Sequence, residues 1–140
     1  MLSLIIIFIG TFWEASMDII GVKHNYDKSF WNRFAKRLDK GKWSRFGTRF
    51  WDNSIAWRNK WKEGDPSKGE HFLGSSTFLS TFVDGWHLCK FFWLMHLFVA
   101  VVMYQSITSW LILDVILLYA VFGAGHELYS RVLLRAKKRA

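Results

Sequence analysis

The sequence predicts an all-α integral membrane protein with three transmembrane helices, an external N-terminus, a cytoplasmic C-terminus and two amphipathic helices at the membrane interface. Apolar residues are gathered in two blocks, 2–13 and 91–122, while charged residues fill 23–70 and 127–140. Such segregation is typical of a chain that alternates between bilayer and water, because a soluble domain spreads apolar residues at helical or strand period. No break in composition divides the chain, so we expect a single membrane domain over 1–140.

The first transmembrane helix is predicted over 2–21, where LSLIIIFIGTFW is wholly uncharged and Glu14 and Asp18 follow. About 20 mainly apolar residues are needed to cross the hydrocarbon core. A cleaved secretory signal is the alternative for this segment. It would require basic residues before the apolar run and a small-residue cleavage site. The first basic residue is Lys23, and EASMD is a poor cleavage site, so we favour a retained helix.

The second and third transmembrane helices are predicted over 82–104 and 107–125, joined by a turn so short that the two must be antiparallel neighbours. Thirteen Lys and Arg residues lie between Lys23 and Lys68, and five lie in 131–139, but the turn has none. The positive-inside rule therefore places the loop over 23–76 and the basic tail over 127–140 in the cytoplasm. We expect a bacterial inner membrane.

The cytoplasmic loop is predicted to contain two amphipathic helices on the membrane surface. The first would be capped by Asp27 or Ser29 and end at Gly41. In the second, one face would carry Phe50, Ser54, Trp57 and Trp61, and the run Gly64-Asp65-Pro66 would end the helix. Basic helices with an aromatic face lie at anionic headgroups. The predicted headgroup-facing residues are Arg33, Lys36, Arg37, Lys40, Trp57 and Trp61. Nucleic-acid binding is the alternative for such residues, but no zinc knuckle, RNP-like strand or helix-turn-helix pattern occurs, so we expect no nucleic-acid partner.

Ionisable residues inside the predicted spans are candidates for function, because each costs a few kcal/mol to insert. Placing the hairpin turn near Gln105 brings one group of them together toward the inner half of the membrane. Its members are Glu14, Asp18, Asp84, His87, His126 and Glu127. Carboxylates with imidazoles are the ligands of di-metal sites in helical bundles and suit iron, manganese or zinc. Two alternatives stay open: a haem held by His87 and His126, and polar packing without any ligand.

A second polar pair is predicted deeper in the membrane. The same turn position sets His96 level with Asp114, so we expect one hydrogen bond between the second and third helices. Asp84 and His96 point about 120° apart on an ideal helix, so this pair cannot belong to the inner group. The single cysteine, Cys89, excludes an internal disulfide and is interpreted as a small buried residue.

The run AWRNKWKEGDP (56–66), with GEHFLGSST (69–77) and DGWH (84–87), resembles a pattern found in small membrane proteins of bacteria and their phages. The resemblance implies a bacterial or phage origin. No activity is attached to that pattern, so it implies no catalytic residues.

These observations together favour a small polytopic inner-membrane protein whose His/carboxylate cluster binds a metal, with no reaction assigned and its status as an enzyme open. No P-loop, GxSxG, CxxC or HExxH motif occurs. Two other functions compete: a non-enzymatic accessory subunit or scaffold of a larger membrane complex, and a phage-encoded pore-forming or membrane effector protein. We expect a homo-oligomer or a subunit of a complex, because three helices can hardly shield so many polar side chains from lipid.

Overall fold

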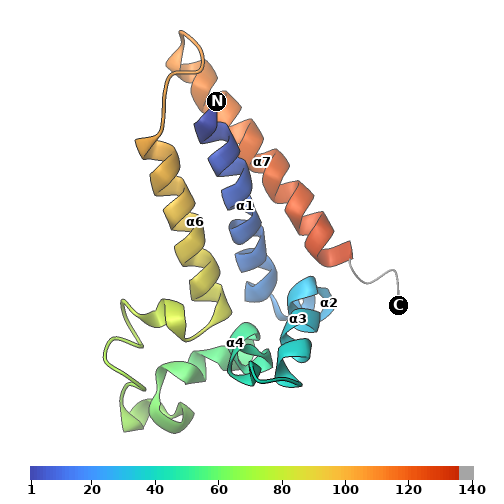
Figure 1. Cartoon of the computed structure of the whole chain (residues 1–140), viewed down its shortest axis with the longest axis vertical. Coiled ribbons are helices and arrows are strands. Elements are labelled where there is room, and N and C mark those ends of the chain that lie inside the picture. Colours follow the sequence, from blue (N-terminus) through green and yellow to red (C-terminus); the bar gives the residue numbers. More distant parts are fainter. Residues whose placement is uncertain (136–140) are drawn as a thin grey trace.

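The computed structural model describes residues 1–135, and these residues form helices with no β-strand (Figure 1). One isolated bridge joins Trp61 and Glu70. The α-helices are α1 (Leu2–Gly21), α2 (Lys23–Lys28), α3 (Phe30–Asp39), α4 (Thr48–Trp51), α5 (Asn53–Ala56), α6 (Gly85–Val102) and α7 (Leu111–Arg135). The 3₁₀ helices are η1 (Ser44–Phe46), η2 (Trp57–Lys60), η3 (Lys62–Gly64), η4 (Pro66–Lys68) and η5 (Ser80–Phe82).

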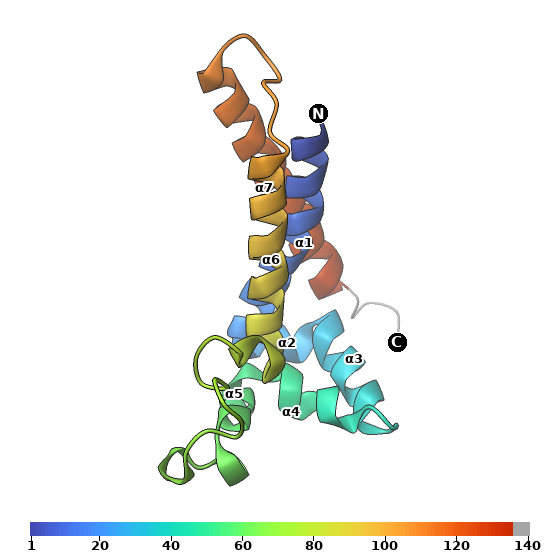
Figure 2. The same cartoon turned by 60° about the vertical axis from the view of Figure 1, so that its left-hand side comes forward.

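Three of the helices, α1, α6 and α7, are long and apolar enough to cross a membrane, which confirms the predicted all-helical class with three candidate spans. They run side by side, and the short helices gather below one end of this bundle (Figures 1 and 2). Few side chains of α6 and α7 are buried within the structure, as expected for helices whose outer surfaces meet lipid. We call the end next to α2–α5 the loop end and the opposite end the hairpin end.

The first two spans lie close to their predicted positions. α1 has the predicted bounds, and α6 begins at Gly85 instead of residue 82. The later start has a local cause, because the Asp84 carboxylate accepts a hydrogen bond from the backbone N–H of His87 at 2.8 Å and so caps α6. Phe82, which was predicted to open the span, instead ends the 3₁₀ turn η5.

The third span differs more from its prediction. α7 begins at Leu111 and continues to Arg135, so the predicted end at 125 is wrong and most of the segment assigned to a basic tail is helical. Residues 136–140, the remainder of that tail, lie outside the described residues. The predicted tight turn is also wrong, because an extended connection from 103 to 110 joins α6 to α7.

The longer connection changes how the helices pack. α1 packs against both α6 and α7, and it lies between them in the bundle (Figure 1). Direct contact between α6 and α7 includes Trp93 and Phe122, whose ring centroids are 5.7 Å apart. With the turn centred near Gln105, Trp93 would have met residue 117 instead. α6 and α7 are antiparallel as predicted, but they are not close neighbours, because each packs mainly on α1. Their register is also shifted by more than one helical turn.

The first amphipathic helix of the loop is present, whereas the second is not. Ser29 caps α3 by accepting from the backbone N–H of Asn32, and the helix buries Trp31 and Ala35. The predicted second helix is broken at Asp52, whose backbone is extended and whose carboxylate accepts from the N–H and hydroxyl of Ser54. Such local side-chain bonds compete with the helical ladder, so the segment divides into α4, α5 and η2.

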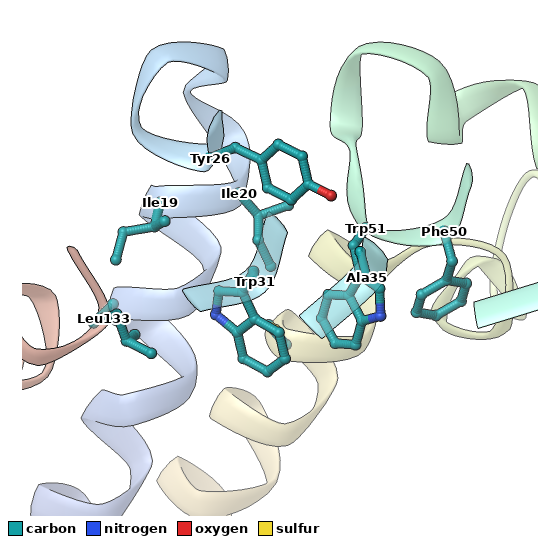
Figure 3. Packing of buried hydrophobic residues seen from close by; sticks show 10 residues of the cluster. Ile19, Ile20, Tyr26, Trp31, Ala35, Phe50, Trp51 and Leu133 are labelled. Carbon is teal, nitrogen blue, oxygen red and sulfur yellow. The ribbon is translucent and has the colours of Figure 1, made fainter. Parts of the chain in front are cut away.

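The buried centre of the loop end is an aromatic cluster that joins α1, α3 and α4 (Figure 3). Trp31 stacks on Trp51 with centroids 4.2 Å apart, and Phe50 meets Trp51 edge to face at 5.3 Å. Burying a side chain such as Phe50 contributes about 2–3 kcal/mol. This cluster couples the short helices to the spans.

An ion pair ties the start of the loop to the break in the second helix. Lys23 bonds to Asp52, and this hydrogen bond raises the pKa of Lys23. Burial alone would raise the pKa of Asp52, but the hydrogen bonds from Lys23 and Ser54 outweigh burial and lower it. The Asp52 carboxylate therefore stays charged and holds α2 against the α4–α5 junction.

Candidate functional site

The candidate site lies where α7 crosses α1 at close range. A Cβ on Gly125 would stand only 2.3 Å from the hydroxyl oxygen of Thr11, so a larger residue fits there only if the Thr11 side chain or a helix moves. Small residues permit this kind of close approach between membrane helices. The crossing sets the next residue, His126, beside Glu14 and Asp18, which are one turn apart on α1 and share a face.

The three side chains meet at ligand-like spacing. His126 Nε2 lies 3.3 Å from Glu14 Oε2 and 3.3 Å from Asp18 Oδ2. One ligand atom from each residue lies within 4.8 Å of the others. Two ligand atoms that bind one ion tetrahedrally, each at about 2.0–2.1 Å, stand about 3.3 Å from each other. The distance from the imidazole nitrogen to each carboxylate oxygen therefore equals the distance expected between two ligands of one ion.

Burial is uneven across the cluster. Glu14 Oε2 is buried and has no hydrogen-bond partner among the described residues, although it lies within ion-pair range of His126. The Asp18 side chain is 60% exposed, so the cluster is closed on the Glu14 side and open on the Asp18 side. Phe122 stacks nearly parallel to the His126 ring, and the Ser130 hydroxyl lies 3.5 Å from Nε2.

Two chemical states fit this arrangement. A protonated imidazole would form an ion pair with both carboxylates, but its single Nε2–H can point directly at only one of them. A divalent cation would instead accept a lone pair from all three side chains at once and would also satisfy Glu14 Oε2. The two states differ in how many of the three side chains are bonded at once: one carboxylate for the imidazolium, and all three ligands for a metal.

The other residues of the predicted metal cluster lie elsewhere. Asp84, which is 2% exposed, bonds to His87 Nδ1 at 2.8 Å, and this pair sits at the start of α6. Glu127 pairs with Arg131 one turn along α7. Among the described residues the only group of three or more His, Cys, Asp or Glu side chains spaced for a metal is Glu14, Asp18 and His126. The two histidines of the haem alternative belong to separate clusters.

The predicted hydrogen bond between His96 and Asp114 is not formed. His96 Nδ1 bonds to the carbonyl of Phe92 at 2.7 Å, within its own helix. Asp114 is fully buried and accepts from the Tyr104 hydroxyl at 2.6 Å and from the backbone N–H groups of Ile107 and Thr108. The register shift explains the error, because the longer connection folds back onto the carboxylate.

The predicted headgroup-facing residues lie at the loop end. Lys36 and Arg37 are exposed on α3, Lys40 is exposed directly after its end, and Trp57 is exposed on η2. Arg33 and Trp61 are partly buried. Phe50 and Trp57, which were predicted to share one face, differ sharply in exposure, at 4% and 42%.

Sequence reasoning missed the contact that assembles the site. Thr11 and Gly125 carry no chemistry of their own, so a search for ionisable residues passes over them. The signal available was the presence of small residues in apolar helices, Gly10–Thr11 in one and Gly123 with Gly125 in the other.

Comparisons with protein families, with curated proteins and with solved structures found no match to this chain.

Proposed function

We propose that this chain is an integral membrane protein that holds one divalent transition-metal ion between α1 and α7, with Glu14, Asp18 and His126 as ligands. The observation that carries the proposal is the convergence of these side chains from two helices, at 3.3 Å from imidazole to each carboxylate. Among the described residues the buried Glu14 Oε2 has an ion-pair contact with His126 but no hydrogen bond, and a metal would bind this oxygen directly.

The donor set narrows the class of metal. One imidazole nitrogen and two carboxylate oxygens suit iron, manganese or zinc, whereas a thiolate would have favoured softer ions. Cys89, the only cysteine, is fully buried and is not part of the group. Three protein ligands leave a coordination position open, as in catalytic rather than structural zinc sites. An ion held this way supplies a Lewis acid that lowers the pKa of a bound water.

We infer the orientation from charge. The hairpin end has no Lys or Arg between residues 91 and 130, whereas thirteen lie between Lys23 and Lys68 at the loop end. The positive-inside rule then places the loop end in the cytoplasm and the N-terminus outside. Exposed basic residues of α3 and the exposed Trp57 would lie at anionic headgroups of an inner membrane. With α7 entering from the hairpin end, the metal ligands fall in the cytoplasmic half of the bundle.

A pore function would need polar side chains that line water. Asp114, one of the residues such a pore would use, is fully buried and bonded within the chain, and His96 is bonded to its own helix. These contacts favour the metal site over the pore as the role of the intramembrane polar residues.

The test is elemental analysis of the full chain purified in detergent without a metal-affinity tag or chelator. We expect about one iron, manganese or zinc ion per chain, and less than about a tenth of that in His126→Ala. His87→Ala is the matched control, since it also removes a histidine paired with a carboxylate and should retain the metal. Metal-free parent protein, or equal loss in both variants, would refute the site.

A further inference from the structure

A second pocket lies at the loop end, away from the metal ligands. It has a volume of about 390 Å³. It is bounded by η1, α4 and η2, and by the two later segments that contain His71 and Val83. Its polar lining consists of Ser44, Arg45, Arg49, Asn59 and His71. No carboxylate lines it, so the pocket combines two fixed positive charges with neutral donors and favours an anion.

The two arginines are free to bind a ligand. Neither Arg45 nor Arg49 has an ion-pair partner within the part of the chain that the structure describes, although acidic residues are paired elsewhere in the loop. They follow each other at a spacing of four residues, one from η1 and one from α4. A guanidinium group can donate two parallel hydrogen bonds to two oxygens of one phosphate, a geometry that a lysine ammonium does not offer.

Hydrogen bonds with Asn59 hold one of these arginines, Arg49, in place. Arg49 Nε donates to Asn59 Oδ1 at 2.8 Å, and Asn59 in turn donates to the carbonyl oxygens of Arg49 and Val83. Because Nε is the atom bonded to Asn59, the two terminal nitrogens of the guanidinium remain for a ligand. Arg45 and Arg49 are both exposed to solvent, and the contacts of Asn59 fix the orientation of the Arg49 side chain at the mouth of the pocket.

The surroundings of the pocket are apolar. Phe50 and Phe82 form part of its wall, and Phe82 is exposed, as are Leu73 and Phe78 in the preceding loop. Phe50 also lines a neighbouring groove of about 340 Å³ whose other walls include Trp43 and further apolar side chains of α3, η1 and α6. A charged pocket beside an apolar groove suits a ligand with a phosphate group and a hydrocarbon chain.

We propose that the Arg45–Arg49 pocket binds a phosphate group, with the headgroup of an anionic phospholipid as the source that the adjoining apolar groove favours. Val83, directly before the cap of α6, lines the pocket, so a bound headgroup would sit beside the entry of a spanning helix into the bilayer. The proposal does not depend on the metal site, because the two share no residue.

The test titrates the detergent-solubilised full chain by calorimetry with three probes: short-chain phosphatidylglycerol, short-chain phosphatidylcholine and inorganic phosphate. We expect phosphatidylglycerol to bind more tightly than phosphatidylcholine, and Arg45→Gln/Arg49→Gln to weaken it at least tenfold. Lys42→Gln/Lys62→Gln is the matched control: it removes the same charge from exposed lysines outside the pocket and should change the affinity less than twofold.

The outcomes are distinguishable. Arginine-dependent binding of inorganic phosphate as tight as that of phosphatidylglycerol would support the pocket and assign a soluble phosphate as the source. Equal weakening in both double variants would overturn the proposal, because net charge alone would then explain binding. Binding unchanged in the arginine variant would also overturn it. If that variant unfolds, Arg45→Lys/Arg49→Lys keeps the charge, and we expect it to lose affinity because it loses the paired geometry.

Discussion

Asp114 and Glu14 are both carboxylates within helices that are long and apolar enough to span a membrane, yet their surroundings are opposite. Asp114 is reached by a hydroxyl and two backbone N–H groups of the preceding connection, so its lone pairs are satisfied from within the chain. Glu14 buries an oxygen that has no hydrogen bond among the described residues. A buried carboxylate that is fully bonded organises structure, whereas one left short of partners is a candidate ligand.

The hydrogen bonds of Asp114 explain why the connection between α6 and α7 is longer than the predicted tight turn. The carboxylate lies in the first turn of α7, where an acid also meets the favourable end of the helix dipole. By collecting donors from Tyr104, Ile107 and Thr108 it shapes the connection, and the connection sets the register of α7 against α1. The structural carboxylate therefore helps to place the ligand carboxylates beside His126.

The largest expected difference between the two carboxylates is in the amount of bound metal. We expect Glu14→Gln to lower bound metal at least tenfold, since an amide oxygen is a poorer ligand than a carboxylate, while Asp114→Asn retains metal in whatever fraction is folded. Elemental analysis of the folded, monodisperse fraction measures both. Metal loss of similar size in the two variants would show that the carboxylates do not differ in role.

For thermal stability, we expect the substitution of Asp114 to have a larger effect than that of Glu14. Asp114→Asn loses charge-assisted hydrogen bonds and leaves donors of the connection unpaired, so we expect its unfolding midpoint to fall by several degrees. Glu14→Gln, measured with metal removed, should unfold at the parent temperature or above it, because burying a neutral amide costs less than burying a charge. A midpoint for Glu14→Gln below that of Asp114→Asn would contradict the assignment.

Moving α7 away from α1 should lower the affinity for the metal. Gly125→Leu places side-chain atoms where Thr11 stands, and overpacking of this kind costs about 1–3 kcal/mol. We expect α7 to move from α1 and metal affinity to fall at least tenfold. Gly123→Leu is the control, since no atom lies within 4 Å of a Cβ at Gly123. Equal affinity in the two variants would show that the close crossing does not assemble the site.

The smallest effect is a pH dependence at the hairpin end. The hydrogen bond to Asp114 raises the pKa of Tyr104, which lies outside the spans. A raised pKa in the folded state stabilises the protein fully below about pH 10, the unfolded value, and this contribution disappears as pH rises through the folded pKa. We therefore expect the unfolding midpoint to decrease above pH 10 more steeply in the parent than in Tyr104→Phe. Parallel curves would mean that the bond contributes nothing measurable.

The metal cluster shows how far ionisable residues can be interpreted before the fold is known. Glu14 and Asp18 could be paired from their spacing on one helix, and His126 could be placed near them by depth. Asp84 and His87 satisfied the same criteria but pair with each other at the cap of α6. Depth alone could not separate the two groups, because residues at one level can face different sides of a bundle.

Three helices long and apolar enough to span a membrane, and the bounds of α1, could be predicted from the residues alone, because those properties depend on the local run of side chains. The same pattern offered Asp27 or Ser29 as the cap of α3, and the structure uses Ser29. The choice of which helices touch could not be predicted in this way, because the crossing of α1 and α7 depends on Gly125 and on a connection shaped by Asp114. The meeting of Glu14, Asp18 and His126 and the pocket around Arg49 follow from such long-range contacts, which no local pattern specifies.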